Sequence, residues 1–300
     1  MAHGEKTRRA IAAQPDWLAR VPTDRRLPAG RVLYTGCGTS FHAAQTGGDA
    51  VQALELVLQP DREADVLVCV SHEGGTPLTL EAARAWAAAG AGRPSPLGKR
   101  SVWLVTGAPE SPLAERADEV VVCAPELEDS WCHTASYTAA VAALAALRGE
   151  DVSWLPAAVT GVLAGPRFPV SEHERWLVAG AGRDWPTAQE AVLKLREGAH
   201  VAAEAWQTEQ LLHGHLAAVD EHVRAFVLEG EGRAAERARD AAAALDALGA
   251  PVTLVPTRHP VVDVVPFQLL TVDLAEARGI DPDPIRRDDP RWARAREVYA

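Results

Sequence analysis

The sequence predicts an α/β protein made of two doubly wound parallel-sheet units in tandem. Its 300 residues exceed the usual size of a single hydrophobic core, so two domains of about 150 residues are expected. Short, almost wholly apolar strands alternate with helical segments, as in parallel sheets covered on both faces. An apolar strand running into a glycine turn opens each half, at 32–38 and at 176–182, which indicates a divergent internal duplication.

The first half is expected to contain four apolar strands joined by helices. The sequence predicts strands at 32–34, 66–70, 102–105 and 120–122, and helices at 41–57, up to about 90, at 113–117 and at 136–147. The segment 149–174 is typical of a linker containing one further helix. We therefore expect a first domain over 1–160, including an N-terminal helix, and a second over 161–300 that ends in a tail.

The second half repeats the pattern from Trp176 onward. Its apolar strand reaches Gly180-Ala181-Gly182, and a long helix is expected to follow as far as about Ala205. Further strands are predicted at 225–228 and 252–255, and a final helix at 266–277. The glycine turn lacks the third glycine of a dinucleotide-binding turn, so no dinucleotide and no other cofactor is expected.

Composition and charge exclude several classes of function. A formal net charge of -11 argues against a nucleic-acid partner, because binding phosphate backbones requires clustered cations. No apolar run approaches the roughly 18 residues of a membrane span, and no secretory signal opens the chain, so a cytoplasmic protein is expected. The four cysteines show neither zinc-ligand nor disulfide spacing, and no metal site is expected.

Two glycine-containing loops follow strands in the first half, where open α/β sheets bind ligands. Each loop also supplies hydroxyl groups at the start of a helix. These hydroxyls could simply cap the helices, but two such loops in tandem favour a binding site. The candidate binding residues of the loops are Cys37, Gly38, Thr39, Ser40, Ser71, His72, Glu73 and Thr76.

Several motifs resemble those of the sugar isomerase (SIS) domain family. In the first half these are 36–40, 71–76 and 111–118. The stretches 190–197, 203–206, 213–214, 266–270 and 279–281 are similar to the isomerase half of glucosamine-6-phosphate synthases, which contains two such domains. The resemblance covers nearly all of the chain from about residue 30, and it implies flavodoxin-like SIS domains in tandem. No glutamine-hydrolysing segment is expected ahead of them.

Glu190, Lys194 and Glu197 fall on one face of the predicted helix, which by itself is typical of a solvated row of ion pairs. The resemblance implies more. By it, Glu197 is the base that moves a proton between C1 and C2 of a sugar, and Lys194 is its partner in the site. His213 matches a histidine that opens the sugar ring from the neighbouring subunit, which implies a homodimer with shared sites.

The sequence also departs from the family pattern. The synthases have a C-terminal lysine that forms a Schiff base with the sugar, whereas the lysines here are Lys6, Lys99 and Lys194. Glu73 replaces the second serine of the phosphate loop, where a carboxylate would repel a phosphate. In the third binding segment, His133 takes the place of a sugar-contacting serine and is followed by Thr134.

Two hypotheses follow for function. The first is an aldose–ketose isomerase of a sugar or sugar-phosphate derivative, possibly coupled to amination, deamination or deglycation, with Glu197 as base and His213 as ring opener. The second is a sensor or binding protein that kept the fold and lost the chemistry. In a variant of the first, a partner protein supplies ammonia. Glu73 leaves open whether the ligand is phosphorylated. It could point away or pair with an arginine or a protonated histidine in a modified phosphosugar site, or it could accept hydrogen bonds from hydroxyls or an amine of an unphosphorylated ligand.

Overall fold

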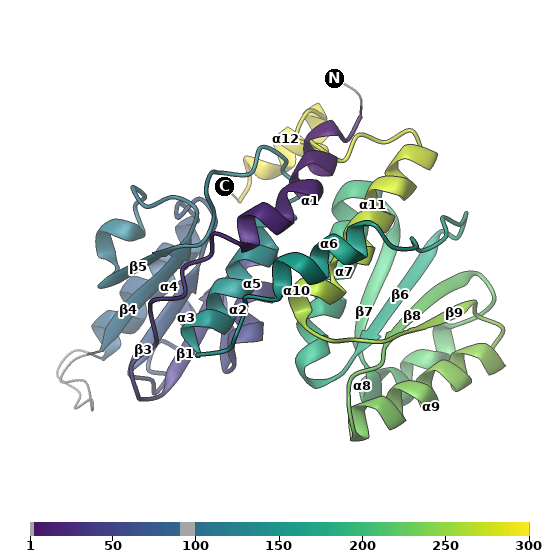
Figure 1. The fold of residues 1–300 in the computed structure, drawn as a ribbon, viewed down its shortest axis with the longest axis horizontal. Coiled ribbons are helices and arrows are strands. Elements are labelled where there is room, and N and C mark those ends of the chain that lie inside the picture. The colour runs from purple at the N-terminus through teal and green to yellow at the C-terminus, as the bar shows by residue number, and fades with distance from the viewer. Residues whose placement is uncertain (1–2, 91–99, 300) are drawn as a thin grey trace.

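The computed structural model describes residues 3–90 and 100–299, so Lys99 lies outside the described residues. The chain is an α/β protein with two parallel sheets and a layer of helices between them (Figure 1). None of the helices in these ranges is long and apolar enough to cross a membrane. All four cysteines are unpaired.

The first sheet has the strand order β2-β1-β3-β4-β5, and every pairing in it is parallel. Its central strands are fully buried apolar runs, as helices on both faces of a sheet require. The order reverses between β1 and β3, which is the switch point where doubly wound sheets bind ligands. The strands are β1 (Val32–Gly36), β2 (Ala50–Gln52), β3 (Val66–Val70), β4 (Ser101–Thr106) and β5 (Glu119–Val122).

The second sheet repeats this topology with one strand fewer. Its order is β7-β6-β8-β9, again all parallel, so β6 corresponds to β1 and β8 to β3. The strands are β6 (Arg175–Gly180), β7 (Ala202–Gln207), β8 (Val223–Leu228) and β9 (Val252–Val255). The predicted pattern of apolar strands is thus confirmed in both halves, and the shared order supports the internal duplication.

Helices complete both units and form the layer between the sheets. In the first half they are α1 (Glu5–Leu18), α2 (Thr39–Gly47), α3 (Ala53–Leu58), α4 (Pro77–Ala89), the 3-10 turn η1 (Ala114–Arg116), α5 (Ala135–Leu147) and α6 (Leu155–Leu163). In the second half they are η2 (Gly182–Asp184), α7 (Trp185–Ala199), α8 (Thr208–Leu212), η3 (His215–Ala218), α9 (Arg233–Ala247), α10 (Pro260–Asp263), α11 (Val265–Ala277) and α12 (Pro290–Arg296).

One hydrophobic core spans the predicted domain boundary. It joins side chains of α1, the first sheet, α5 and α6 to side chains of α10 and α11 from the end of the chain. In Figure 1 these helices lie together between the two sheets. The division into 1–160 and 161–300 remains a prediction, and the shared core shows that each half contributes to the packing of the other.

Two predicted helices are wrong in extent, and a third is not the final helix of the chain. The helix expected over 41–57 is broken at Gly47 and Gly48, and the short edge strand β2 follows. Gly47 packs against Tyr34, where an added Cβ would lie 2.4 Å from the ring. The helix expected to reach Ala205 ends at Ala199, because His200 adopts a left-handed conformation and β7 begins at Ala202. The helix at 266–277 is confirmed as α11 but is followed by α12.

Candidate functional site

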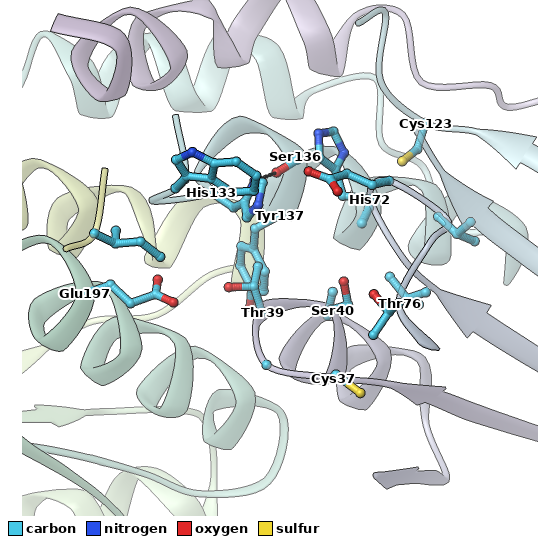
Figure 2. A pocket seen from close by; sticks show the side chains of 18 of the residues that line it. Cys37, Thr39, Ser40, His72, Thr76, Cys123, His133, Ser136, Tyr137 and Glu197 are labelled. Atoms are coloured by element: carbon cyan, nitrogen blue, oxygen red, sulfur yellow. Dashed lines mark hydrogen bonds between the residues drawn. The ribbon is translucent and has the colours of Figure 1, made fainter. Parts of the chain in front are cut away.

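A cavity of about 270 Å³ lies at the carboxyl ends of β1 and β3, at the switch point of the first sheet (Figure 2). Its walls come from the two predicted loops, from the start of α5, from α7 and from the C-terminal tail. The polar and charged residues that line it are Cys37, Thr39, Ser40, His72, Glu73, Thr76, Cys123, Trp131, His133, Ser136, Tyr137, Glu197 and Arg287.

The turn after β1 is built so that only glycine fits at its first position. A Cβ on Gly36 would lie 2.8 Å from the backbone of Ser40, and Gly38 has a φ of 55°. This tight turn starts α2 directly beneath the cavity. It places the side chains of Thr39 and Ser40 in the cavity wall, as Figure 2 shows.

The second loop also turns on a glycine, since Gly74 has a φ of 60° and a Cβ there would lie 2.0 Å from Ser111 Oγ. His72, Glu73 and Thr76 line the cavity. Ser71 is buried behind them, with its hydroxyl 3.3 Å from that of Thr76. His72 Nε2 accepts a 2.9 Å hydrogen bond from the backbone N–H of residue 128, and burial lowers the pKa of His72 to about 4.

A buried carboxylate organises the start of α5. Glu128 accepts hydrogen bonds from the backbone N–H and hydroxyl groups of both Thr134 and Ser136, at 2.7 to 3.0 Å. Burial raises the pKa of Glu128, and these four donors act against that rise. Thr134 therefore faces Glu128, whereas His133, Ser136 and Tyr137 line the cavity. Burial, with the nearby cations, lowers the pKa of His133 to about 3.

Helix α7 brings a buried ion network to the cavity from the second half. Lys194 Nζ lies 2.6 Å from Glu197 Oε2, 3.4 Å from Glu190 Oε1 and 3.1 Å from Thr39 Oγ1. His42 Nδ1 lies 2.8 Å from Glu190 Oε2. The side chains of Lys194 and Glu190 are fully buried, while Glu197 remains one-quarter exposed in the cavity wall.

This geometry replaces the surface ion-pair row that spacing alone suggests. Burial by itself lowers the pKa of Lys194, but Glu197 and Glu190 beside it raise the pKa above its usual value. The ammonium group is therefore a fixed cation that orients the Glu197 carboxylate.

The C-terminal tail closes one side of the cavity. Ile285 and Arg286 both have positive φ angles, 43° and 61°, which is unusual for a β-branched and a long side chain. The strained turn directs Arg287 to the cavity, where its Cζ lies 3.3 Å from the centroid of the Trp131 ring. Burial lowers the pKa of Arg287, and the negative charge of Glu73 counteracts that effect.

His213 lies apart from the cavity. It is at the end of α8 with its side chain 71% exposed, and its Nε2 is 2.8 Å from Glu209 Oε1. Arg237 binds the same carboxylate. Within one chain, His213 is thus held by a surface pair, and its predicted role in a neighbouring subunit stays a prediction.

The structure gathers most of the predicted site residues in one place. Nine of them line the cavity: Cys37, Gly38, Thr39, Ser40, His72, Glu73, Thr76, His133 and Glu197. Ser71 and Lys194 lie behind it in contact with lining residues, and Thr134 shares Glu128 with Ser136. Among the described residues, no group of three or more His, Cys, Asp or Glu side chains could hold a metal.

Sequence reasoning missed several lining residues. Ser136 and Tyr137 follow His133 directly, so extending that motif by one helical turn could have found them. The Tyr137 hydroxyl is buried without a hydrogen-bond partner among the described residues. Arg287 carries no local signal, because only long-range packing brings it to the site. Glu128 is held by residues only six and eight positions later in the chain.

The fold and the cavity can be compared with those of known proteins. The fold and the cavity define an α/β protein with two parallel sheets and a ligand pocket at a strand switch point. No protein-family model matches the chain. The chain is 28% identical over 85% of its length to glutamine–fructose-6-phosphate aminotransferase (isomerizing) of Gloeobacter violaceus. It spans about half the length of the curated relatives that it matches.

Solved structures show the same fold. The C-terminal domain of glucosamine-fructose-6-phosphate aminotransferase from Francisella tularensis matches 94% of this chain and 98% of its own, with a TM-score of 0.78 at 20% identity. Tagatose-6-phosphate ketose/aldose isomerase from Escherichia coli matches 94% and 95%, with a TM-score of 0.78 at 19% identity. The relatives and neighbours are thus aminotransferase isomerase domains and phosphosugar isomerases, which confirms the resemblance to SIS proteins at this level.

Proposed function

We propose that the chain is a sugar isomerase-type enzyme whose cavity binds a sugar derivative and moves a proton between C1 and C2. The observation that carries the proposal is the position of Glu197. Its carboxylate lines the cavity, is fixed by Lys194 at 2.6 Å, and shares the cavity with the hydroxyls of Thr39, Ser40 and Thr76. The names of the relatives support sugar isomerisation as the class of reaction.

The proposed step is a balanced proton transfer. Glu197 takes the proton from C2 of an open-chain aldose. The electron pair of that C–H bond forms the C1=C2 bond, and the π pair of the C1=O1 bond moves to O1, which gives an enediol once O1 is protonated. The same carboxyl group then returns a proton to C1, while the hydroxyl proton of O2 moves to O1. A positioned base of this kind contributes about 10²- to 10⁴-fold to the rate. Fixing the carboxylate with Lys194 lowers the cost of orientation.

Ring opening and assembly are also proposals. His213 is exposed and could enter the cavity of a second copy of the chain, in the manner that the resemblance implies for a homodimer. Coupling to amination would need a separate source of ammonia. The tail residues 285–291 contain no lysine that could form a Schiff base with the sugar. The simplest version of the function is therefore isomerisation without a covalent intermediate.

The test is proton exchange at C1 and C2 in D₂O, followed by NMR. The substrates are fructose, tagatose and glucosamine, each with and without a 6-phosphate. Glu197→Gln should reduce exchange by at least about 10²-fold, while Glu236→Gln, the same change at an exposed site on α9, should leave it unaltered. Full exchange in Glu197→Gln would sink the proposal. Binding without exchange in the unaltered protein would favour the sensor.

A further inference from the structure

The charges on the cavity wall do not suit a phosphate dianion. Among the described residues that line it, the charged side chains are two carboxylates, Glu73 and Glu197, and one cation, Arg287. Lys194 lies behind the wall and is neutralised by Glu190 and Glu197. A dianion would thus enter a site in which negative charges outnumber the available positive charge.

The two cavity histidines add no cation. His72 Nε2 accepts the N–H of residue 128 and therefore carries no proton. His133 Nδ1 lies 3.4 Å from the hydroxyl of Ser136, whose own proton is donated to Glu128. His133 is therefore the donor in that pair, which leaves its other ring nitrogen as an acceptor.

Two hydroxyl groups of the wall, those of Thr39 and Ser136, donate their protons to protein carboxylates, whereas the buried Tyr137 hydroxyl has no partner among the described residues. Thr39 Oγ1 donates to Glu190 Oε1 at 3.2 Å and accepts from Lys194 Nζ at 3.1 Å. Ser136 donates to Glu128 at 2.7 Å. The hydroxyls of Ser71 and Thr76 share one hydrogen bond between them. Toward a ligand, Thr39 and Ser136 can therefore only accept hydrogen bonds, which suits hydroxyl and ammonium donors and not an anion.

The start of α4 is also a weaker anion site than a helix start usually is. Helix α4 begins with Pro77, which has no backbone N–H, after Thr76 as the capping residue. Glu73 stands just ahead of it in the loop. Among the described residues its side chain has no hydrogen bond or short ion pair, although its charge acts on Arg287 and raises the pKa of that group. The protein places its own carboxylate where the resemblance predicts a phosphate-binding serine.

Arg287 does not reverse this balance. Its guanidinium is stacked on Trp131, and its Nε is buried without a hydrogen-bond partner. The negative charge of Glu73 raises the pKa of Arg287, so part of the charge of this cation is already offset by a carboxylate of the cavity wall.

We infer that the ligand of this cavity is an unphosphorylated sugar derivative, with a hydroxyl or ammonium group donating hydrogen bonds to Glu73. The inference rests on the proposed sugar-binding function and deepens it. Glu73 is then the residue that determines specificity, and the acceptor-rich wall of Thr39, His133 and Ser136 receives further hydrogen bonds from the sugar.

The first experiment compares matched ligands by calorimetry. Glucosamine and fructose should each bind at least about tenfold more tightly than their 6-phosphates, because a dianion beside Glu73 is repelled. Tighter binding of glucosamine than of glucose would identify an ammonium group at Glu73, and equal binding would identify a hydroxyl. Tighter binding of either 6-phosphate to the unaltered protein would overturn the inference.

The second experiment restores the usual serine. Glu73→Ser should gain at least about tenfold in affinity for inorganic phosphate and for fructose-6-phosphate. Glu81→Ser, which removes the same charge from an exposed position on α4, should gain nothing. Thermal melting verifies that both variants are folded. If Glu73→Ser gains no phosphate affinity, Glu73 does not exclude phosphate, and the inference is wrong even if no sugar in the panel binds.

These outcomes separate the inference from the proposed function. Tight binding of free sugars without C1/C2 exchange would keep the inference and reject the isomerase. Exchange on a 6-phosphate that binds tighter than the free sugar would keep the isomerase and reject the inference.

Discussion

The glycine turns that open the two halves, at 36–38 and 180–182, have nearly the same backbone geometry. The first borders the cavity, whereas the second is filled by a protein side chain. A Cβ on Gly36 would lie 2.8 Å from the backbone of Ser40, and one on Gly180 would lie 2.8 Å from the backbone of Asp184. The next glycines, Gly38 and Gly182, have φ angles of 55° and 57°. The sequence duplication is therefore preserved as a duplication of turn geometry.

The difference lies in the side chain that follows each turn. After the first turn, Ser40 faces an open cavity. After the second, Asp184 is only 1% exposed and accepts a 3.0 Å hydrogen bond from Thr257 Oγ1. A Cβ on Gly230 would lie 3.1 Å from Asp184 Oδ2, so the carboxylate fills the space beside β8. The same supersecondary unit can thus hold a ligand or be closed by its own side chain.

The largest expected loss of stability is at Lys194 of α7, the helix by which the second half of the chain completes the cavity of the first. Lys194→Met would leave Glu190 and Glu197 without their cation, and should cost about 3 to 5 kcal/mol of unfolding free energy. Chemical denaturation would measure it. Lys194→Met combined with Glu190→Gln should recover part of the loss, because the uncompensated charge is removed. A loss below about 1 kcal/mol would mean that the network is solvated and does not join the halves.

An intermediate loss of stability is expected when the first glycine of either turn is replaced. Gly36→Ala and Gly180→Ala should each lose about 1 to 3 kcal/mol, because both add a methyl group against backbone atoms. Only Gly36→Ala should also weaken sugar binding, since only the first turn borders the cavity. Equal loss of sugar binding in both variants, at matched stability, would contradict the division of roles.

The last expected effect is a pH dependence of the folding stability that comes from Asp263 in α10. Burial, with the charge of Asp184, raises the pKa of Asp263 to about 7, and its carboxyl accepts the backbone N–H of Arg258. The folded state then holds a proton that the unfolded state releases near pH 4, so stability should fall as pH rises from about 4 to 7.

Asp263→Asn should remove about 1 to 3 kcal/mol of this dependence. Relative to the unaltered protein, the variant should therefore be more stable at pH 8 than it is at pH 5. Thermal melting at both pH values measures it. An unchanged pH dependence in the variant would show that Asp263 is not the titrating group.

Local sequence patterns were sufficient for much of the fold and for part of the site. Apolar runs identified the central strands, and the glycine turns identified the two loops that line the cavity. Patterns failed where packing overrides them. Residues 202–207 continue an Ala-rich, helix-like sequence, yet they pair with β6 as an edge strand. The break at Gly47 follows from its contact with Tyr34 of the preceding strand β1, which only the packing of α2 on that strand creates.

The sequence by itself determined the central apolar strands, the glycine turns and the presence of Glu73 and Glu197, because strand periodicity and glycine requirements are local properties. Only the tertiary structure decided which hydroxyls keep a free proton, that Lys194 is buried between two carboxylates, and that Arg287 reaches the cavity. Several of these features depend on contacts between distant segments, such as that of Thr39 with Glu190, which is 151 residues later in the chain. No local pattern encodes the direction of such a hydrogen bond, and that direction is what distinguishes an anion site from a sugar-hydroxyl site.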